Sequence, residues 1–340
     1  MSSSHAVGGA RNDGPPPLVS RFARALEDYQ RSDRTFQVLS TIRPDSSLEA
    51  QAPPVPPEAI LVLDSSFNPP TLAHKRMALS ALFEDGRADG SSSSGGSSSG
   101  SKGRKARILL LLAINNADKA PKPAAFPQRL AMMQIFGAEL LSDVIAAAGR
   151  HGDDGRYGCA GVDVAVTTEP YFHAKAAAVA ASDFYRGGAP AEGSGEKEEE
   201  APPPEPEQVY LTGFDTLIRI FDPKYYANNA MARALDPFFA RARLRVTTRT
   251  DADWGDAAAQ GAYLEQLRRG GGLERVGGRA GWADRIEMVE GRKDGSEEVV
   301  SSTKVREAVL RRDWEALRKL VSGDVAGWIR EQGLYAEVSV

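Results

Sequence analysis

Short apolar runs rich in β-branched residues recur along the chain, separated by stretches in which apolar positions follow helical spacing. Such runs are typical of strands that a parallel sheet buries on both faces. We expect six strands, at residues 60–63, 106–114, 162–167, 208–212, 243–248 and 285–289. The stretches between and after them predict helices following Pro70, at 128–145, at 173–184, ending at Phe221, and at 256–268, 303–311, 314–320 and 325–332.

This alternation of strands and helices predicts the fold class. Helices of this length between strands indicate right-handed βαβ units, and therefore an α/β fold with a Rossmann-like, doubly wound parallel sheet. In such sheets, ligands bind outside the carboxyl ends of the strands. We expect the polar motifs of this chain to meet there. They lie at 64–74, 115–122, 169–172, 213–215, 249 and 301–306.

The remaining sequence predicts one domain with a tail and two inserts. Residues 1–57 are interpreted as an N-terminal tail with a short amphipathic helix over 18–29, which either docks on the domain or stays loose. Residues 58–340 are interpreted as the domain. A Gly/Ser tract at about 86–105 and an acidic, Pro-rich tract at about 187–207 lack the apolar side chains of a core, so disordered inserts are expected.

Composition excludes several classes of protein. Of 340 residues, 41% are hydrophobic, and the net charge of −4 is too close to neutral for a nucleic-acid surface. The single cysteine, Cys159, excludes an internal disulfide framework, and the four scattered histidines disfavour a structural zinc site. No apolar run has the length of a membrane span, and the N-terminus lacks the apolar core of a signal peptide. We expect a cytoplasmic protein, with the nucleus as an additional location.

The stretch from Ala59 to Leu82 organises the candidate chemistry. A polar turn follows its apolar run, and Pro70 can open the next helix, where a missing N–H costs nothing. The helix start offers free N–H groups and the positive end of a dipole, which favour phosphate. Thr71 and His74 lie one turn apart on the same face. Taken alone, they would equally fit a threonine cap and an incidental histidine.

A second predicted helix start, SSTKVR at 301–306, carries hydroxyls and two cations. Serine and threonine at such positions are ordinarily caps. Combined with Lys304 and Arg306, however, they form an arrangement suited to holding a polyphosphate and neutralising its charge.

These segments resemble the nicotinamide mononucleotide adenylyltransferases, a family of the nucleotidylyltransferase superfamily. SSFNPPTLAH resembles the family's GSFNPxTxxH segment, and VSSTKVR resembles its ISSTKxR motif. GFDTLIRIFDPKYY looks like a fungal branch, and LRRDWEALRKLVSGDVAGWIREQGLY is similar to the family's C-terminal tail. The resemblance implies a sheet of the nucleotidylyltransferase type. It also implies adenylyl transfer from ATP to nicotinamide mononucleotide, or to nicotinate mononucleotide, giving NAD and pyrophosphate.

The resemblance implies roles for individual residues. Thr71, His74 and Arg306 would be catalytic, through contacts with the phosphates. The residues implied to bind ATP are Ser66, Phe67, His74, Gly213, Asp215, Arg249, Ser302, Thr303, Lys304 and Arg306. Mg²⁺ would bridge ATP oxygens and use few protein ligands, so no metal-binding residue is assigned.

The implied mononucleotide site departs from the family pattern. Lys119 and Lys122, in NNADKAPKPAAFPQRLAMM, are candidates for the contact to the mononucleotide phosphate, with a solvated lysine pair as the alternative. The family places a tryptophan after the third strand, to stack on the nicotinamide ring. Tyr171 and Phe172 stand there instead, and either could stack. The family's glycine before SFNP is Ser65 here, which requires a different backbone approach to the phosphates.

Two other functions stay open at the level of sequence. One is a nucleotidylyltransferase with another acceptor, such as phosphopantetheine or a cytidylyl-transfer substrate. The other is a protein of this fold that binds or hydrolyses ATP and acts through protein partners. A class I aminoacyl-tRNA synthetase is disfavoured by the length, the net charge and the lack of a further tRNA-binding domain. The expected partners are ATP and a pyridine mononucleotide, without nucleic acid or membrane, and the sequence does not reveal the oligomeric state.

Overall fold

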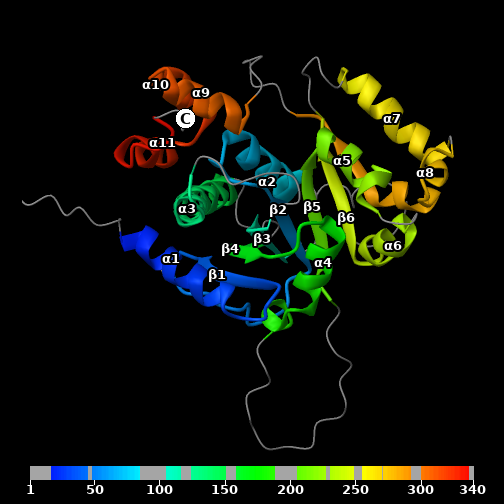
Figure 1. Ribbon diagram of the computed structural model, residues 1–340, viewed down its shortest axis with the longest axis horizontal. Coiled ribbons are helices and arrows are strands. Elements are labelled where there is room, and N and C mark those ends of the chain that lie inside the picture. Colours follow the sequence, from blue (N-terminus) through cyan, green and yellow to red (C-terminus); the bar gives the residue numbers. More distant parts are fainter. Residues whose placement is uncertain are drawn as a thin grey trace, which may run out of the picture.

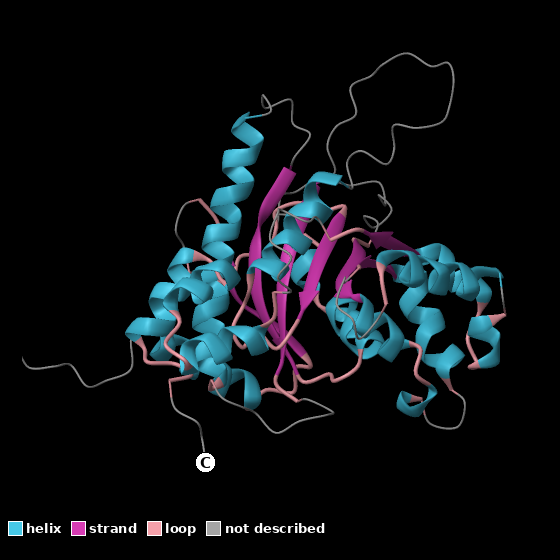
Figure 2. Ribbon diagram, turned by 90° about the horizontal axis from the view of Figure 1, so that it is seen from above, coloured by secondary structure: helices cyan, strands magenta, loops and turns pink. Residues whose placement is uncertain are grey.

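The computed structural model describes residues 17–44, 48–84, 105–115, 124–150, 158–187, 205–226, 230–248, 255–269, 271–291 and 300–336. These residues form three layers, with one sheet between two groups of helices (Figure 1). Figure 2 shows the same layers from above, with the strands running between the helices.

The sheet has seven strands in the order β1-β4-β3-β2-β5-β6-β7. The strands are β1 (Phe36–Ile42), β2 (Ala59–Asp64), β3 (Lys105–Ala113), β4 (Gly158–Thr167), β5 (Glu207–Gly213), β6 (Ala242–Thr247) and β7 (Ile286–Val289). Neighbouring strands are parallel, except that β1 is antiparallel to β4. The predicted doubly wound parallel sheet is confirmed. From β2 the chain adds β3 and β4 on one side and later β5 to β7 on the other, so the winding reverses between β2 and β5. Ligands of such sheets bind at this reversal.

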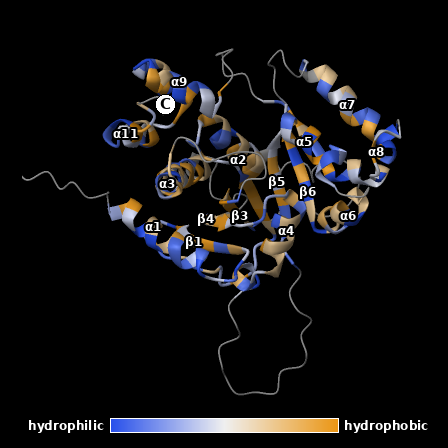
Figure 3. Cartoon of the chain, in the orientation of Figure 1, coloured by the Kyte–Doolittle hydropathy of each residue, from blue (hydrophilic) through white to orange (hydrophobic). Residues whose placement is uncertain are grey.

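The helices cover the two faces of the sheet. On the first face lie α1 (Pro17–Gln30), α2 (Leu72–Glu84), α3 (Phe126–Arg150), α9 (Ser302–Leu310), α10 (Trp314–Leu320) and α11 (Gly323–Glu331). On the second face lie α4 (Phe172–Ala181), η2 (Asp183–Tyr185), α5 (Phe214–Ile220), η3 (Pro223–Tyr225), α6 (Met231–Arg241), α7 (Ala257–Arg269), α8 (Gly272–Arg275) and η5 (Ala280–Arg285). Leu61 and Leu63 of β2 point into the first core, whereas Ile60 and Val62 point into the second. Figure 3 shows this pattern, with apolar colour along the strands and polar colour on the outer helices.

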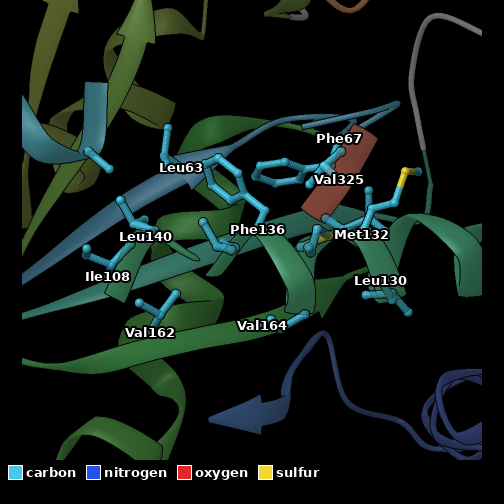
Figure 4. Packing of buried hydrophobic residues seen from close by; sticks show 14 of the residues in the cluster. Leu63, Phe67, Ile108, Leu130, Met132, Phe136, Leu140, Val162, Val164 and Val325 are labelled. Atoms are coloured by element: carbon cyan, nitrogen blue, oxygen red, sulfur yellow. The ribbon is translucent and has the colours of Figure 1, made fainter. Parts of the chain in front are cut away.

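The first core is built around α3. Figure 4 shows Phe136 and Leu140 of this helix facing Leu63, Ile108 and Val162 from three neighbouring strands. All five side chains are buried. The window Phe126–Ala148 has the length and hydropathy of a membrane span, but 56% of it is buried inside the structure. The packing identifies α3 as a core helix.

Several elements have no counterpart in the pattern expected from sequence, among them β1 and α6. β1 lies at the sheet edge and mixes polar with apolar residues, and its Ser40 and Thr41 are buried. No continuous apolar run therefore marks it. α6 contains Pro237 in its interior, a residue that normally breaks a helix.

The N-terminal helix docks on the domain. Val19, Phe22, Leu26 and Tyr29 of α1 are buried in the first core, and the helix lies against α3. Together with β1, it packs against the rest of the sheet. The domain limit at residue 57 and the two inserts stay predictions, because the inserts fall almost wholly outside the described residues.

A buried polar network joins the edge strand β1 to the centre of the sheet. Arg107 of β3 and Asp163 of β4 form an ion pair, 2.6 Å between Nη2 and Oδ1, and neither side chain is exposed. Thr41 of β1 donates to Asp163 Oδ1 at 2.7 Å, and Tyr185 of η2 donates to Oδ2 at 3.0 Å. Arg107 also donates to the carbonyl of Gln51 at 3.1 Å. The network thus connects five separate segments: β1, β3, β4, η2 and the segment that contains Gln51.

Candidate active site

The turn between β2 and α2 lies at the carboxyl end of the central strand. Phe67 has a positive φ of 43°, which is uncommon for a residue with a side chain. Its ring is fully buried in the first core, close to Val325 in Figure 4, and this packing holds the turn in place. Ser66 is exposed. Of these two predicted ATP contacts, Ser66 offers its side chain, whereas Phe67 has only its backbone to offer.

Hydrogen bonds at both ring nitrogens hold His74 in one orientation. The backbone N–H of Thr71 donates to Nδ1 at 3.0 Å, and Thr71 Oγ1 lies 2.8 Å from the same atom. Since Nδ1 accepts the backbone N–H, it carries the lone pair, and the ring proton is on Nε2. Nε2 lies 3.0 Å from Ser65 Oγ and donates to it. The structure therefore brings the predicted pair together as one fixed hydrogen-bond donor.

His74 is electrically neutral at physiological pH. Burial lowers its pKa to about 4, and the ring of Phe67 lies 5.3 Å away between centroids. The residue lies in the first turn of α2. At this end of the helix, both the positive end of the helix dipole and the free backbone N–H groups favour a negatively charged ligand. This end of the helix suits a phosphate oxygen.

The second predicted helix start is present in α9. Ser301 is the N-cap, and its side chain accepts the backbone N–H of Lys304 at 3.3 Å. Arg306 Nη2 donates to Thr303 Oγ1 at 3.3 Å. The ordinary capping interaction and the cationic helix start therefore occupy the same turn of α9.

Side chains join this helix start to the β2–α2 turn. Ser302 Oγ donates to the carbonyl of Pro69 at 2.8 Å, across 233 residues of sequence. Arg306 Nη1 donates to the carbonyl of Asn68 at 2.8 Å, and the hydroxyl of Tyr335 donates to Asn68 Oδ1 at 2.9 Å. The two predicted phosphate-binding segments thus form one structure.

A third predicted segment follows β5, the neighbour of β2. Gly213 is the N-cap of α5 and Asp215 lies in the first turn, while Phe214 between them is buried in the second core. Because β5 is parallel to β2, this helix start lies at the same end of the sheet as the β2 turn. The winding reverses between these two strands, which is where sheets of this type form their ligand-binding crevice.

The aromatic turn after β4 distinguishes its two predicted stacking residues. Phe172 is partly buried and meets Tyr210 edge-on, with ring centroids 5.5 Å apart. Tyr171 is 38% exposed and stacks on His173 at 5.7 Å, with 5° between the ring planes. Tyr225 lies 6.3 Å from Tyr171. Of the two predicted stacking residues, Tyr171 is the exposed one.

Sequence reasoning missed an ion pair at the same crevice. Lys175 Nζ of α4 lies 2.5 Å from Asp64 Oδ2 at the end of β2, and each side chain is only 7% exposed. The available signals were a charged residue closing an apolar strand and a lone lysine in the alanine-rich stretch AKAAAVAA. Their contact, across 111 residues, cannot be read from either segment alone.

Three predicted site residues lie outside the residues that the structure describes. They are Lys119, Lys122 and Arg249. Their assignment to the mononucleotide phosphate and to ATP stays a prediction.

The chain was compared with protein-family models, with curated proteins and with solved structures. No protein-family model matches the chain. A Schizosaccharomyces pombe protein named "Putative nicotinamide mononucleotide adenylyltransferase" is 30% identical over 312 residues, which is 92% of this chain and 96% of the relative. The chain is also similar to two solved structures of Plasmodium falciparum nicotinic acid mononucleotide adenylyltransferase, one complexed with NaAD and one with APC. Each match covers 82% of this chain and 97% of the P. falciparum chain. Their identities are 12% and 10% and their TM-scores 0.38 and 0.36. Overlap that loose does not align individual residues.

Proposed function

Because this chain belongs to the nicotinamide mononucleotide adenylyltransferase family, we propose that it transfers the adenylyl group of ATP to a pyridine mononucleotide, releasing pyrophosphate. Membership rests on the relative that matches along nearly the whole of both chains. The structural observation that supports the proposal is the pair of hydrogen bonds that join the start of α9 to the turn before α2. Ser302 donates to the carbonyl of Pro69, and Arg306 donates to that of Asn68. We place the reaction in the cytoplasm, with the nucleus as an additional location.

The reaction requires no nucleophile from the protein. The 5′-phosphate oxygen of the mononucleotide attacks the α-phosphorus of ATP in line. A new P–O bond forms, the bond to the α,β-bridging oxygen breaks, and pyrophosphate leaves with the electron pair. The attacking group is already an anion, so positioning and charge stabilisation supply the catalysis.

The two helix starts would provide that stabilisation. His74 Nε2–H donates to a phosphate oxygen in place of Ser65 Oγ, and Thr71 keeps the ring in the donating tautomer. Arg306 and Lys304 neutralise the β- and γ-phosphates, with Ser302 as a hydroxyl donor. Arg306 is already held by the carbonyl of Asn68, so little ordering of this side chain is needed on binding. Ser302 would exchange its hydrogen bond to the carbonyl of Pro69 for one to a phosphate oxygen.

Mg²⁺ would supply further charge neutralisation when bound to the ATP oxygens. Within the described part of the chain, no group of three or more His, Cys, Asp or Glu residues is placed to hold a metal ion. Mg²⁺ is usually held mainly by substrate phosphates and water rather than by a set of protein ligands. Asp215, in the first turn of α5, is our candidate for a contact to the metal or its water.

The decisive experiment incubates purified full-length protein with ATP, Mg²⁺ and nicotinamide mononucleotide. We expect NAD and pyrophosphate to form in equal amounts, as measured by chromatography and a pyrophosphate assay. ATP binding or hydrolysis with no dinucleotide from any pyridine mononucleotide would contradict the proposal. It would favour instead a protein that binds ATP and acts through partners.

A further inference from the structure

The ion pair of Lys175 and Asp64 lies where a substrate should bind, yet the chemistry above leaves it without a role. Asp64 is the last residue of the central strand β2. Lys175 lies in α4, three residues after Phe172, the first residue of that helix. Nζ and Oδ2 are 2.5 Å apart, and each side chain is 7% exposed. Burial of two charges is costly and is weak evidence of a stabilising role, so another reason for the pair is required.

The strand register points to a third polar group on the same face as this pair. β2 and β5 are parallel, and their pairing ends with Val62 opposite Tyr210. Extended by two residues, the same register would put Thr212 level with Asp64, on the same face of the sheet. Thr212 is 5% exposed, and its hydroxyl has no hydrogen-bond partner among the described residues. A buried polar group without a partner is rare and calls for a ligand or water.

This cluster lies on the other face of the sheet from the proposed phosphate-binding side chains. His74 and Arg306 belong to helices α2 and α9, which cover the first face of the sheet, whereas α4 covers the second (Figure 1). Tyr171, the exposed candidate for stacking, lies one helical turn before Lys175. Lys175 Nζ lies 5.3 Å from the ring centroid of Phe172, the residue that follows Tyr171. We assume that an acceptor ring stacked on Tyr171 directs its substituent toward the pair.

The pair offers both kinds of hydrogen-bonding partner. An ammonium group has three N–H donors and a carboxylate has about four acceptor positions, and their mutual bond uses one of each. A carboxamide needs an acceptor for its NH₂ and a donor for its carbonyl, which match Asp64 and Lys175. A carboxylate has acceptors only, so it would be attracted by Lys175 but repelled by Asp64.

We propose that Asp64, Lys175 and Thr212 form the recognition site for the pyridine substituent, and that they select the carboxamide of nicotinamide mononucleotide over the carboxylate of nicotinate mononucleotide. This inference rests on the proposed function, because it assumes a pyridine mononucleotide in the crevice. Asp64 has a further role, since it balances Lys175 next to the positively charged pyridinium ring.

The test is equilibrium binding by calorimetry of each mononucleotide to the full-length protein, with transfer assayed in parallel. The wild type should bind nicotinamide mononucleotide more tightly. Asp64→Asn should shift the ratio of the two dissociation constants toward nicotinate by about 10- to 100-fold, because one carboxylate oxygen becomes an NH₂ donor and the negative charge is lost. Thr212→Val, nearly isosteric, should weaken binding of nicotinamide mononucleotide several-fold and serves as the test if Asp64→Asn fails to fold.

Asp236→Asn is the matched control, because it removes the same charge from a surface pair with Arg279, 2.6 Å between Nε and Oδ1. It should leave the ratio unchanged. An unchanged ratio in Asp64→Asn, a wild type that prefers nicotinate, or failure of both mononucleotides to bind would each overturn the inference. Selective binding without dinucleotide formation would instead contradict the proposed function and leave the recognition site standing.

Discussion

Individual hydrogen bonds fix the donors of the crevice before any ligand arrives. Thr71 sets the tautomer of His74, and carbonyls of the β2–α2 turn hold Ser302 and Arg306. Most of these residues could be predicted from sequence, because each acts at a helix start whose residues are contiguous. Lys175 and Asp64 could not, because their roles depend on a contact between distant segments.

His74→Ala is expected to lower kcat about 10²- to 10³-fold, since one preorganised donor to the transition state is removed. The melting temperature should change little. His74→Asn, which retains an N–H donor, should recover part of the rate. An unaltered kcat together with an unaltered KM for ATP in His74→Ala would exclude this residue from the site.

The lowered pKa of His74 also predicts a pH dependence of stability. Its pKa is about 4 in the folded protein and 6.5 in the unfolded chain. As pH falls below 6.5, the unfolded chain takes up the proton first. The contribution of neutral His74 to the free energy of unfolding is therefore complete above pH 6.5. It is lost as the pH falls from 6.5 to 4, by about 3 kcal/mol in total. Urea unfolding of wild type and His74→Gln at pH 7 and pH 4 measures this loss as a difference, and parallel pH profiles would contradict it.

Elements with a strong local pattern were predictable, and the others were not. Strands β2 to β5 appear as apolar runs because they contribute to the cores on both faces of the sheet, whereas β6 and β7 contribute apolar residues to the second core only. β1 could not be predicted from an apolar run, because its buried residues include the polar Ser40 and Thr41. Distant parts of the chain supply the environment of these two side chains. α6 could not be predicted because Pro237 in its interior disfavours a helix. The packing of Leu235, Phe238 and Phe239 in the second core stabilises the helix in spite of this proline.

The buried pair of Arg107 and Asp163 is expected to hold β1 in the sheet. Asp163→Asn leaves Arg107 buried without a counter-charge, which should cost about 3–5 kcal/mol of unfolding free energy. Replacing both residues by apolar ones, Arg107→Met with Asp163→Leu, should cost much less. Chemical denaturation of the three proteins measures this, with hydrogen exchange of residues 36–42 as a local probe. A double variant less stable than Asp163→Asn would contradict this account.

The whole molecule divides its crevice between two faces of one sheet, and the sequence could not reveal this. It indicated which segments reach the carboxyl ends of the strands but neither the strand order nor which helices share a face. In the structure, α2 and α9 carry His74, Ser302 and Arg306 on the first face, whereas Tyr171 immediately precedes α4 on the second. The two substrates should therefore be held by separate sets of residues.

This division predicts that ligand-induced stabilisation can be removed one substrate at a time. A ligand at 100 times its Kd stabilises the folded state by about 2.7 kcal/mol, so a non-hydrolysable ATP analogue and nicotinamide mononucleotide should each raise the Tm by a few degrees. Arg306→Ala should reduce the rise caused by the analogue and leave the rise caused by the mononucleotide. Tyr171→Ala should do the reverse, because loss of stacking is remote from the triphosphate. Thermal melts of the three proteins with each ligand measure this. If each variant reduced both rises equally while keeping its unliganded Tm, the crevice would be a single undivided site.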